Sequence, residues 1–212
     1  MRIILSPIAL LFGLPCLVLG QHWDVGADGG YGFLRDVSVT SGSATGMAGF
    51  SPGVAFGAVL GNQMNRLVGG EIRYTYRADD LRVSSGSTEA KVTGQSHALH
   101  YDVLIHATSR ESPVRPFLAI GGGVKFYRGT GAEASYQPLS NLVVLTHTSE
   151  AQPLISVGGG VKFAVTKRAL VRLDFRDYAT PLPTSLLATP GNNKIGGWMH
   201  DFVFLVGVGT AF

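Results

Sequence analysis

Apolar and polar residues alternate along almost the whole chain after its first twenty residues. Within 68–77, for example, Ile72 and Tyr74 fall on one face while Glu71 and Arg73 fall on the other. Because the side chains of a strand point alternately to the two faces of a sheet, this period of two predicts strands and not helices. Eight such segments occur, at roughly 23–33, 50–61, 67–78, 95–107, 116–128, 153–166, 169–178 and 198–212.

The connections between these segments alternate in length. Residues 34–49, 79–94, 129–152 and 179–197 are long and rich in Ser, Thr, Gly and Pro, whereas 62–66, 108–115 and 167–168 are short. Each segment has about the 9–11 residues that a tilted strand needs to cross a bilayer. Long loops on one side and short turns on the other are typical of membrane barrels. The pattern predicts an all-β fold, an eight-stranded antiparallel up-and-down transmembrane β-barrel with both termini on the short-turn side.

The polar faces of these segments carry nearly balanced charge. Side chains fill the lumen of an eight-stranded barrel, and buried charges must be paired, so balanced charge fits a polar lumen. We expect a structural network of lumenal charges formed by Asp24, Asp28, Glu71, Arg73, Arg77, Asp102, Lys125, Lys162, Arg172, Asp174 and Arg176. The alternative is a soluble exported β-barrel or sandwich with the apolar face inside, binding an apolar ligand.

Aromatic residues lie toward the ends of the apolar faces, which favours the membrane barrel. Rings at these depths are typical of the girdles that face the two membrane–water interfaces. The aromatic residues in question are Trp23, Phe33, Tyr76, Phe126, Phe163 and Phe204.

Composition narrows the possible partners and compartments. Charged residues make up 15% of the 212 residues, against about 25% in an average soluble domain. The net charge of +3 is spread along the chain without a basic run, so we expect no nucleic-acid partner.

The N-terminal segment reads as a secretory signal. Arg2 is followed by a mostly apolar stretch, and the small residues Val18 and Gly20 suit a cleavage site before Gln21. Pro7 and the shortness of this stretch argue against the other reading, a membrane-spanning helix. We therefore expect residues 1–20 to be a cleaved signal peptide and residues 21–212 to be an exported barrel domain. The single cysteine lies within 1–20, which excludes a disulfide framework from the mature chain.

The last strand carries a family resemblance. Its outward positions Phe204, Val206, Val208, Thr210 and Phe212 resemble the C-terminal assembly signal of Gram-negative outer-membrane barrels. Residues 21–212 resemble the small eight-stranded barrel domain of OmpA-like and OmpX-like proteins. The resemblance implies location in the outer membrane, contact with membrane lipid and lipopolysaccharide, and recognition by the outer-membrane assembly machinery. OmpA proteins add a peptidoglycan-binding domain after the barrel; none follows here, so cell-wall tethering is not expected.

Candidate catalytic and metal-binding motifs are weak. The stretch 49–53, GFSPG, matches the G-x-S-x-G elbow of serine hydrolases, but Pro52 lacks the N–H that the oxyanion hole requires. On one strand, His100 and His106 stand about 20 Å apart and His97 points the other way, so a shared metal is not expected.

Enzymes that modify lipid A are the one catalytic class left open. They need a histidine beside Ser or Asp near the loop side of the lipid boundary, and only His147 and His200, next to Asp201, meet that requirement. No spacing joins either histidine to a particular serine. We expect no catalysis, no cofactor and no metal.

The long loops suggest a structural role or a role in surface interaction. Segment 179–197 contains Leu186 and Leu187, and segment 141–148, NLVVLTHT, is an alternating run that suggests a hairpin projecting beyond the membrane. A projecting hairpin can bind a partner by strand addition, although a solvated loop is the simpler reading. A surface ligand remains unidentified. Transport is not expected, because eight strands leave no open channel.

The sequence GGGVKF occurs twice, at 121–126 and 158–163. A phosphate-binding loop would need a helix after the glycines, and the pattern predicts none. Both triplets fall inside predicted strands joined by 129–152, so a centred loop would pair Gly121 with Gly160, Gly122 with Gly159 and Gly123 with Gly158. We expect one glycine patch that lets the sheet bend and leaves room for arginines, with Lys125 near the loop end and Lys162 near the turn end.

Overall fold

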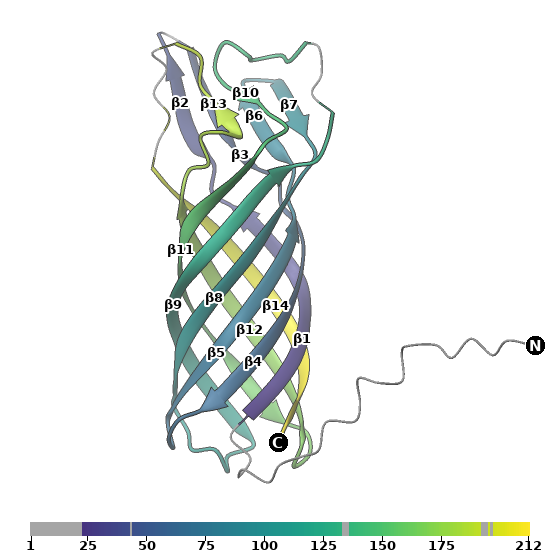
Figure 1. Cartoon of the computed structure of the whole chain (residues 1–212), viewed down its shortest axis with the longest axis vertical. Coiled ribbons are helices and arrows are strands. Elements are labelled where there is room, and N and C mark those ends of the chain that lie inside the picture. The colour runs from purple at the N-terminus through teal and green to yellow at the C-terminus, as the bar shows by residue number, and fades with distance from the viewer. Residues whose placement is uncertain (1–22, 43, 133–135, 192–194, 196) are drawn as a thin grey trace, which may run out of the picture.

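The structure is a computed structural model that describes residues 23–42, 44–132, 136–191, 195 and 197–212 (Figure 1). The expected signal peptide, residues 1–20, lies outside the described residues. The strands are β1 (Trp23–Leu34), β2 (Val37–Ser41), β3 (Ala44–Phe50), β4 (Gly53–Gln63), β5 (Val68–Ala78), β6 (Leu81–Ser85), β7 (Thr88–Val92), β8 (Gly94–His106), β9 (Val114–Gly129), β10 (Val144–Leu145), β11 (Ser149–Ala164), β12 (Ala169–Pro181), β13 (Leu187–Ala188) and β14 (Trp198–Ala211). Within the described part of the chain, no helix has the length and apolar character needed to cross a membrane.

Eight of these strands close into an antiparallel barrel. Their order around the barrel is β1-β14-β12-β11-β9-β8-β5-β4, so each strand pairs with its neighbours along the chain and β1 closes against β14. All eight predicted segments become these barrel strands, and the predicted fold class is confirmed. The largest differences are at the loop ends, where β11 begins at Ser149 and β12 continues to Pro181.

The described ends of the chain meet at the end of the barrel that carries the short turns (Figure 1). The Trp23 amide donates to the Phe212 carbonyl at 3.1 Å, and the Phe212 amide donates to the Trp23 carbonyl at 2.9 Å. We call this end of the barrel the turn end, and the opposite end the cap end.

The cap end carries a second layer of β-structure that the sequence pattern did not predict. Strands β2, β3, β6 and β7 form a four-stranded sheet within what were expected to be loops 34–49 and 79–94. A further pair, β10 with β13, joins the other two long connections through Val144↔Ala188 and Leu145↔Leu187. The run 141–148 is therefore not a projecting continuation of the β9–β11 hairpin, whose pairing ends at Arg128↔Ser149.

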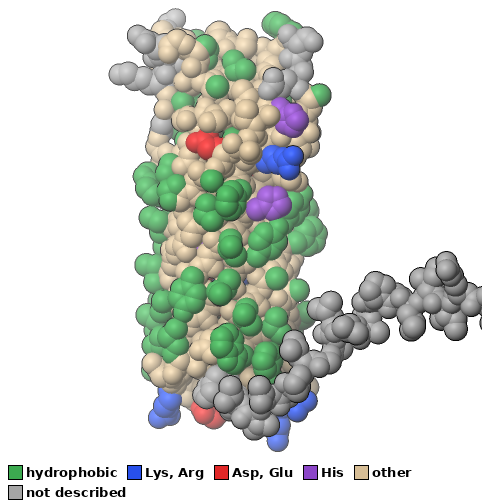
Figure 2. Space-filling model, in the orientation of Figure 1, with side chains coloured by type: hydrophobic (Ala, Val, Ile, Leu, Met, Phe, Trp, Pro, Cys, Tyr) green, Lys and Arg blue, Asp and Glu red, His purple; other side chains and the backbone are tan. Residues whose placement is uncertain are grey.

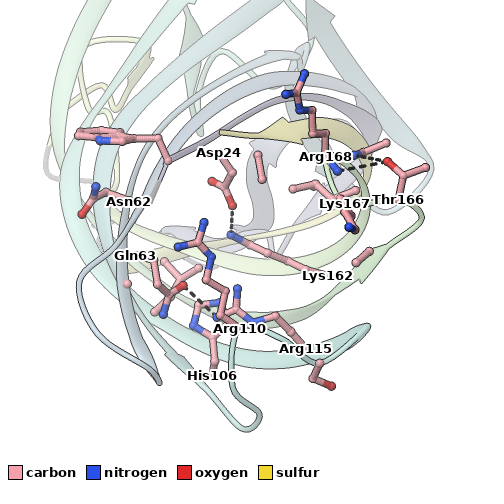
Figure 3. Close-up of a pocket in the computed structure, with 18 of the residues that line it drawn as sticks. Asp24, Asn62, Gln63, His106, Arg110, Arg115, Lys162, Thr166, Lys167 and Arg168 are labelled. Carbon is pink, nitrogen blue, oxygen red and sulfur yellow. Dashed lines mark hydrogen bonds and ion pairs between the residues drawn. The ribbon is translucent and has the colours of Figure 1, made fainter. Parts of the chain in front are cut away.

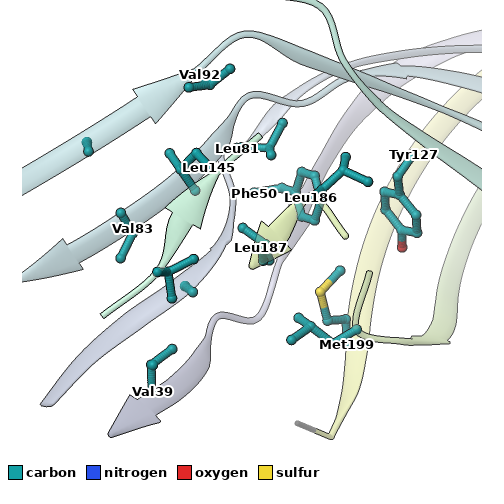
Figure 4. Close-up of a cluster of buried hydrophobic side chains, with 14 of the residues drawn as sticks. Val39, Phe50, Leu81, Val83, Val92, Tyr127, Leu145, Leu186, Leu187 and Met199 are labelled. Carbon is teal, nitrogen blue, oxygen red and sulfur yellow. The ribbon is translucent and has the colours of Figure 1, made fainter. Parts of the chain in front are cut away.

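The cap encloses its own apolar core, and the upper part of the barrel contributes to it (Figure 4). Leu142, Leu145, Leu186 and Leu187 are all at most 1% exposed. Phe50 stacks on Tyr127, with ring centroids 5.1 Å apart. The remaining buried members are Leu34, Val39, Ala48, Leu81, Val83, Ala90, Val92, Val143, Leu182 and Met199. Because these side chains pack together, the long connections form an ordered cap, and the reading of Leu186 and Leu187 as part of a solvated loop is wrong.

The outer wall of the barrel is apolar. Large hydrophobic side chains stand outward with high exposure, among them Leu118 at 69% and Val208 at 64%. Figure 2 shows such side chains covering the wall on one face, with charged side chains at the turn end and, above the apolar band, toward the cap. The predicted girdle residues Trp23, Phe33, Phe126 and Phe204 are exposed on this wall, and Tyr76 and Phe163 are half-buried on it.

Candidate functional site in the barrel lumen

The middle of the lumen holds a cluster of three arginines and four carboxylates, which come from four different strands. Glu71 accepts from all three arginines: from Arg73 at 3.2 Å, from Arg172 at 3.1 Å and from Arg176 at 2.8 Å. Asp174 also contacts all three, at 3.1, 2.6 and 3.0 Å in the same order. The side chains of these five residues are at most 1% exposed, so each charge depends on the others for its solvation.

Two further carboxylates extend the central cluster toward the neighbouring strands. Asp28 on β1 accepts from Arg73 at 2.6 Å, and Asp102 on β8 accepts from Arg176 at 2.9 Å. The barrel geometry explains this convergence. Every second side chain of a strand points into the lumen, and residues from different strands of the closed sheet come to lie at the same depth.

A hydrogen-bonded group continues from Asp102 toward the cap. His100 Nδ1 lies 3.0 Å from Asp102 Oδ1, and His100 Nε2 lies 3.2 Å from the Tyr178 hydroxyl. That hydroxyl is also 3.2 Å from Thr75 Oγ1, and Ser156 donates to Asp102 at 3.3 Å. These polar side chains connect the arginine cluster to the next charged layer.

The upper layer is a balanced group of two cations and two acids. Asp201 pairs with Arg77 and, at 2.5 Å, with Lys125. Asp79, which follows β5 and lies outside the barrel strands, approaches Arg77 at 3.9 Å and accepts from Ser96 at 2.9 Å. Burial raises the pKa of the Asp79 carboxyl, while Lys125 and Arg77 oppose the shift. This layer lies directly beneath the apolar core of the cap, since Lys125 Nζ is 4.9 Å from the ring of Tyr127.

The lowest ion pair joins Lys162 and Asp24 at 2.5 Å near the turn end. Phe117 separates this pair from the central cluster. Its buried ring lies 5.6 Å from the Arg172 guanidinium, 5.7 Å from that of Arg176 and 6.0 Å from Lys162 Nζ. The ring faces the guanidinium groups at distances suited to cation–π attraction. Phe117 therefore fills this level of the lumen and also stabilises the neighbouring cations.

The two glycine triplets lie on adjacent strands but not opposite one another. Residues 121–123 pair with Ser156, Ile155 and Leu154 in turn, and residues 158–160 pair with Ala119, Leu118 and Phe117. Gly121 was expected to pair with Gly160 and pairs with Ser156, so the expected register is wrong by four residues. The cause is the early start of β11 at Ser149, because the loop before it packs into the cap and is not centred on the hairpin.

The glycines on the lumenal face make room for particular side chains. A Cβ on Gly158 would collide with the Phe175 carbonyl of the neighbouring strand and lie 2.9 Å from Cδ of Arg176. One on Gly160 would collide with the Leu173 carbonyl and lie 2.8 Å from the Phe117 ring. A Cβ on Gly123 would lie 2.6 Å from Cβ of His100. The repeated motif thus supplies two separate clearances, one on each strand, and its lysines lie apart, Lys125 in the upper layer and Lys162 near the turn end.

All eleven residues of the expected charge network lie in the lumen or at its mouth, and the structure adds two acids to them. Asp201 precedes Phe202 on β14 and has the lumenal parity, so alternation alone could have identified it. Asp79 lies beyond the predicted end of its strand, where parity gives no information. Phe117 has the parity of Lys125 on β9, but its apolar type does not suggest a lumenal position.

The other candidate residues are dispersed. His97 faces outward and bonds Tyr74 at 2.8 Å, whereas His100 and His106 are buried at different levels. No group of three or more His, Cys, Asp or Glu side chains within the described ranges is placed to hold a metal ion. Ser51 lies between β3 and β4, where its amide donates to the Asp80 carbonyl. His200 pairs with Asp177 at 2.8 Å on the outer wall, not with Asp201, which faces the lumen.

Comparisons with known proteins agree with this architecture. No family model matches the chain, and no curated protein matches it. Among solved structures, outer membrane protein OprG from Pseudomonas aeruginosa aligns with a TM-score of 0.58 at 14% identity, over 91% of this chain and 97% of that one. Neisserial surface protein A aligns with a TM-score of 0.55 at 14% identity, over 90% of this chain and 97% of that one. At these identities the likeness concerns the fold, and the fold of this chain is that of small eight-stranded outer-membrane barrels.

Proposed function

We propose that this chain is an integral outer-membrane barrel without catalytic activity, and that it acts as a structural element and through surface contacts made by its cap. Its wall contacts membrane lipid and, in the outer leaflet, lipopolysaccharide. The exposed last strand, with Phe204, Val206, Val208, Thr210 and Phe212, serves the outer-membrane assembly machinery as its recognition signal.

The distribution of burial supports a membrane location. Large apolar side chains cover the wall, while the four arginines Arg73, Arg77, Arg172 and Arg176 are at most 1% exposed inside. A soluble barrel needs the opposite arrangement, because water solvates charges and excludes apolar surface. The alternative of a soluble barrel with an apolar ligand inside therefore has no support from the described lumen, whose middle holds buried ion pairs.

The layered charges support a role without conduction. Ion pairs and the Phe117 ring occupy successive levels between the cap and the turn end. We expect the purified chain in planar lipid bilayers to give no sustained ionic conductance. Stable open channels at neutral pH would contradict this part of the proposal.

The cap is the observation that carries the proposal of surface contacts. Its sixteen-residue buried cluster makes the extension an ordered structure in which side chains on its outer surface hold fixed positions. Binding to a preformed surface costs less ordering free energy than binding to flexible loops. A cap held rigid by its own core is therefore suited to recognition.

Heat-modifiability tests the membrane barrel. The unboiled chain should run faster on a denaturing gel than the boiled chain, and it should fractionate with the outer membrane. Recovery in the soluble periplasmic fraction would overturn the proposal.

A cap variant tests the surface role. Cells displaying a chain with residues 37–48 and 82–91 replaced by short Gly-Ser turns should lose adhesion that the intact chain confers; equal adhesion would remove the surface role.

A second candidate function rests on the outward-facing pair of His200 and Asp177. The carboxylate lies 2.8 Å from Nδ1 of a half-exposed imidazole, an arrangement that orients a general base. The pair lies beside the aromatic residue Phe202, whose ring stacks on His200 at 6.2 Å. This candidate predicts a change in lipid A acylation, seen by mass spectrometry, when the gene is deleted and its reversal by wild type but not by His200→Ala. Unchanged lipid A would eliminate it.

A further inference from the structure

A cavity of about 160 Å³ opens at the turn end of the barrel, below the lowest ion pair (Figure 3). Its wall includes Asp24 from the first strand, Gln63 from β4, His106 from β8, Arg115 from β9 and Lys162 from β11. The cavity is thus built from residues far apart in sequence, held in place by the closed sheet. Its volume leaves room for a small oxyanion together with water.

The lining of this cavity is strongly cationic. Arg110, Arg115, Lys162, Lys167 and Arg168 are the basic residues of the lining, and Asp24 is its acid. Asp24 is already bound to Lys162 at 2.5 Å. In Figure 3 the cationic ends of Arg110, Arg115 and Lys162 converge on the opening, whereas the side chain of Arg168 points away from it. Such a concentration of positive charge in a recess attracts anions.

Two side chains in the wall present polar atoms without partners among the described residues. Arg115 donates through Nη2 to Gln63 Oε1 at 2.9 Å, which fixes its position, while its buried Nε has no acceptor there. His106 is 2% exposed, and its buried Nε2 has no partner in the described part of the chain. Buried polar atoms are normally hydrogen-bonded, so these two atoms indicate that a ligand or water completes the site.

The surroundings of His106 determine which kind of anion fits. Its Nδ1 lies 3.3 Å from the Leu67 carbonyl, an acceptor, so Nδ1 carries the proton in the neutral ring and Nε2 is left as an acceptor. An acceptor inside a basic cavity suits an anion that itself carries a proton. At neutral pH hydrogen phosphate and phosphate monoesters exist partly in protonated form, and sulfate does not.

We propose that this cavity binds a hydrogen phosphate group, with Arg110, Arg115 and Lys162 providing positive charge and His106 Nε2 accepting the proton of the phosphate. The group can belong to free inorganic phosphate or to a phosphate monoester, which share this chemistry. The site depends only on the geometry of the turn end. Its exposure to the periplasm follows if the chain spans the outer membrane as proposed above.

Isothermal titration of the folded chain in nonionic micelles tests the site with sodium phosphate, sodium sulfate and glycerol 3-phosphate. We expect saturable binding of phosphate, about tenfold tighter than that of sulfate, because sulfate leaves the histidine acceptor unmatched. Comparable binding of glycerol 3-phosphate would assign the site to a monoester, and binding of the inorganic ion alone would assign it to free phosphate. Equal affinity for sulfate and phosphate, or no saturable binding, would overturn the proposal.

Variants separate the cavity from general surface charge. Arg115→Gln should weaken phosphate binding about tenfold, since it removes a charged donor. Arg66→Gln changes a turn arginine outside the lining and should leave binding within about twofold. His106→Met should abolish the preference for phosphate over sulfate. The gel mobility of unboiled samples shows whether each variant is folded. Equal weakening by Arg66→Gln and Arg115→Gln would assign the binding to diffuse charge and refute the site; the proposed function of the barrel would be unaffected.

Discussion

Arg172 offers the most direct measurement of what the lumenal charges contribute. Its guanidinium donates to Asp174 at 2.6 Å and to Glu71 at 3.1 Å, and the arginine is 1% exposed. Replacing Arg172 by Leu leaves two arginines to balance the four carboxylates of the central cluster. The stability lost can be reckoned in two ways: as two charged hydrogen bonds at about 1.5–3 kcal/mol each, or as one broken buried ion pair at about 3–5 kcal/mol. The two values are similar.

We therefore expect Arg172→Leu to lower the free energy of unfolding by about 3 kcal/mol or more, equivalent to a hundredfold or larger change in the folding equilibrium. The assay is reversible urea unfolding in lipid vesicles, followed by tryptophan fluorescence. Trp23 and Trp198 both stand on the outer wall, at 41% and 52% exposure, so their emission reports the lipid environment. Gel mobility of unboiled samples provides an independent measure of the folded fraction.

Two controls make the test decisive. Arg128→Leu removes an exposed arginine from the same barrel and should change stability by no more than about 0.5 kcal/mol. In the double variant Arg172→Leu with Glu71→Gln, the loss should be smaller than the sum of the single losses by at least about 1 kcal/mol, because the two residues share one interaction. A loss for Arg172→Leu no larger than that for Arg128→Leu would refute the buried network.

Three further changes test the clearances, the cap and the last strand. Gly158→Ala should destabilise the barrel by about 1–3 kcal/mol in the same assay, because its Cβ would collide with the Phe175 carbonyl and also meet Arg176. Gly122→Ala, whose Cβ meets the Leu154 carbonyl at 3.2 Å, should cost less, and the reverse order would contradict the assigned role. Leu187→Ala should lower the stability of the cap by about 2–5 kcal/mol. Limited proteolysis should then cleave the cap faster, while the gel mobility of the unboiled barrel stays unchanged. A cap that resists proteolysis equally well would show that this apolar core does not order the cap. Phe212→Ser should reduce the amount of folded chain in the outer membrane of cells while purified chain still folds in micelles; unchanged amounts would remove the proposed assembly signal.

Alternation in the sequence was sufficient to predict the strands of the barrel and to sort their residues into two faces. A period of two specifies which residues share a face, and a closed sheet leaves one face inside. The nearly balanced charge of the polar face and the aromatic residues near the ends of the apolar face then placed Arg73, Arg172 and Arg176 in the lumen. The register between β9 and β11 was beyond such reasoning, because parity is unchanged when a strand slips by an even number of residues. The four-residue error in pairing Gly121 is a slip of that kind.

The cap was missed for a different reason. Its strands are short, as in β2 and β7 with five residues each and β10 with two, and they lie in segments rich in turn-forming residues. Their stability comes from packing between connections that are remote in sequence, such as Leu145 against Leu187, so no local window contains the signal. Asp79 was overlooked for another reason: it lies just beyond the predicted end of its strand, where alternation does not say which way a side chain points, although its partner Arg77 lies inside that strand.

The cavity at the turn end could be predicted only in part. Lys162 and Asp24 were both expected in the lumen. The hydrogen bond between Arg115 and Gln63, however, depends on the register of strands that are separated in sequence. The tautomer of His106 depends on the carbonyl of Leu67, which belongs to a turn whose backbone geometry the sequence does not specify.

The long-range ion pairs also have a consequence for how the chain reaches its membrane. Asp24 and Lys162 are 138 residues apart, and Arg73 and Asp174 are 101 apart, so these charges meet only when β1 has closed against β14. Contacts of such high sequence separation form slowly. A half-closed sheet would carry unneutralised cations and open hydrogen-bonding edges, both costly in hydrocarbon. Closure and entry into the bilayer are therefore one coupled event, and partly assembled chains are kept at the water boundary by their own interior charges.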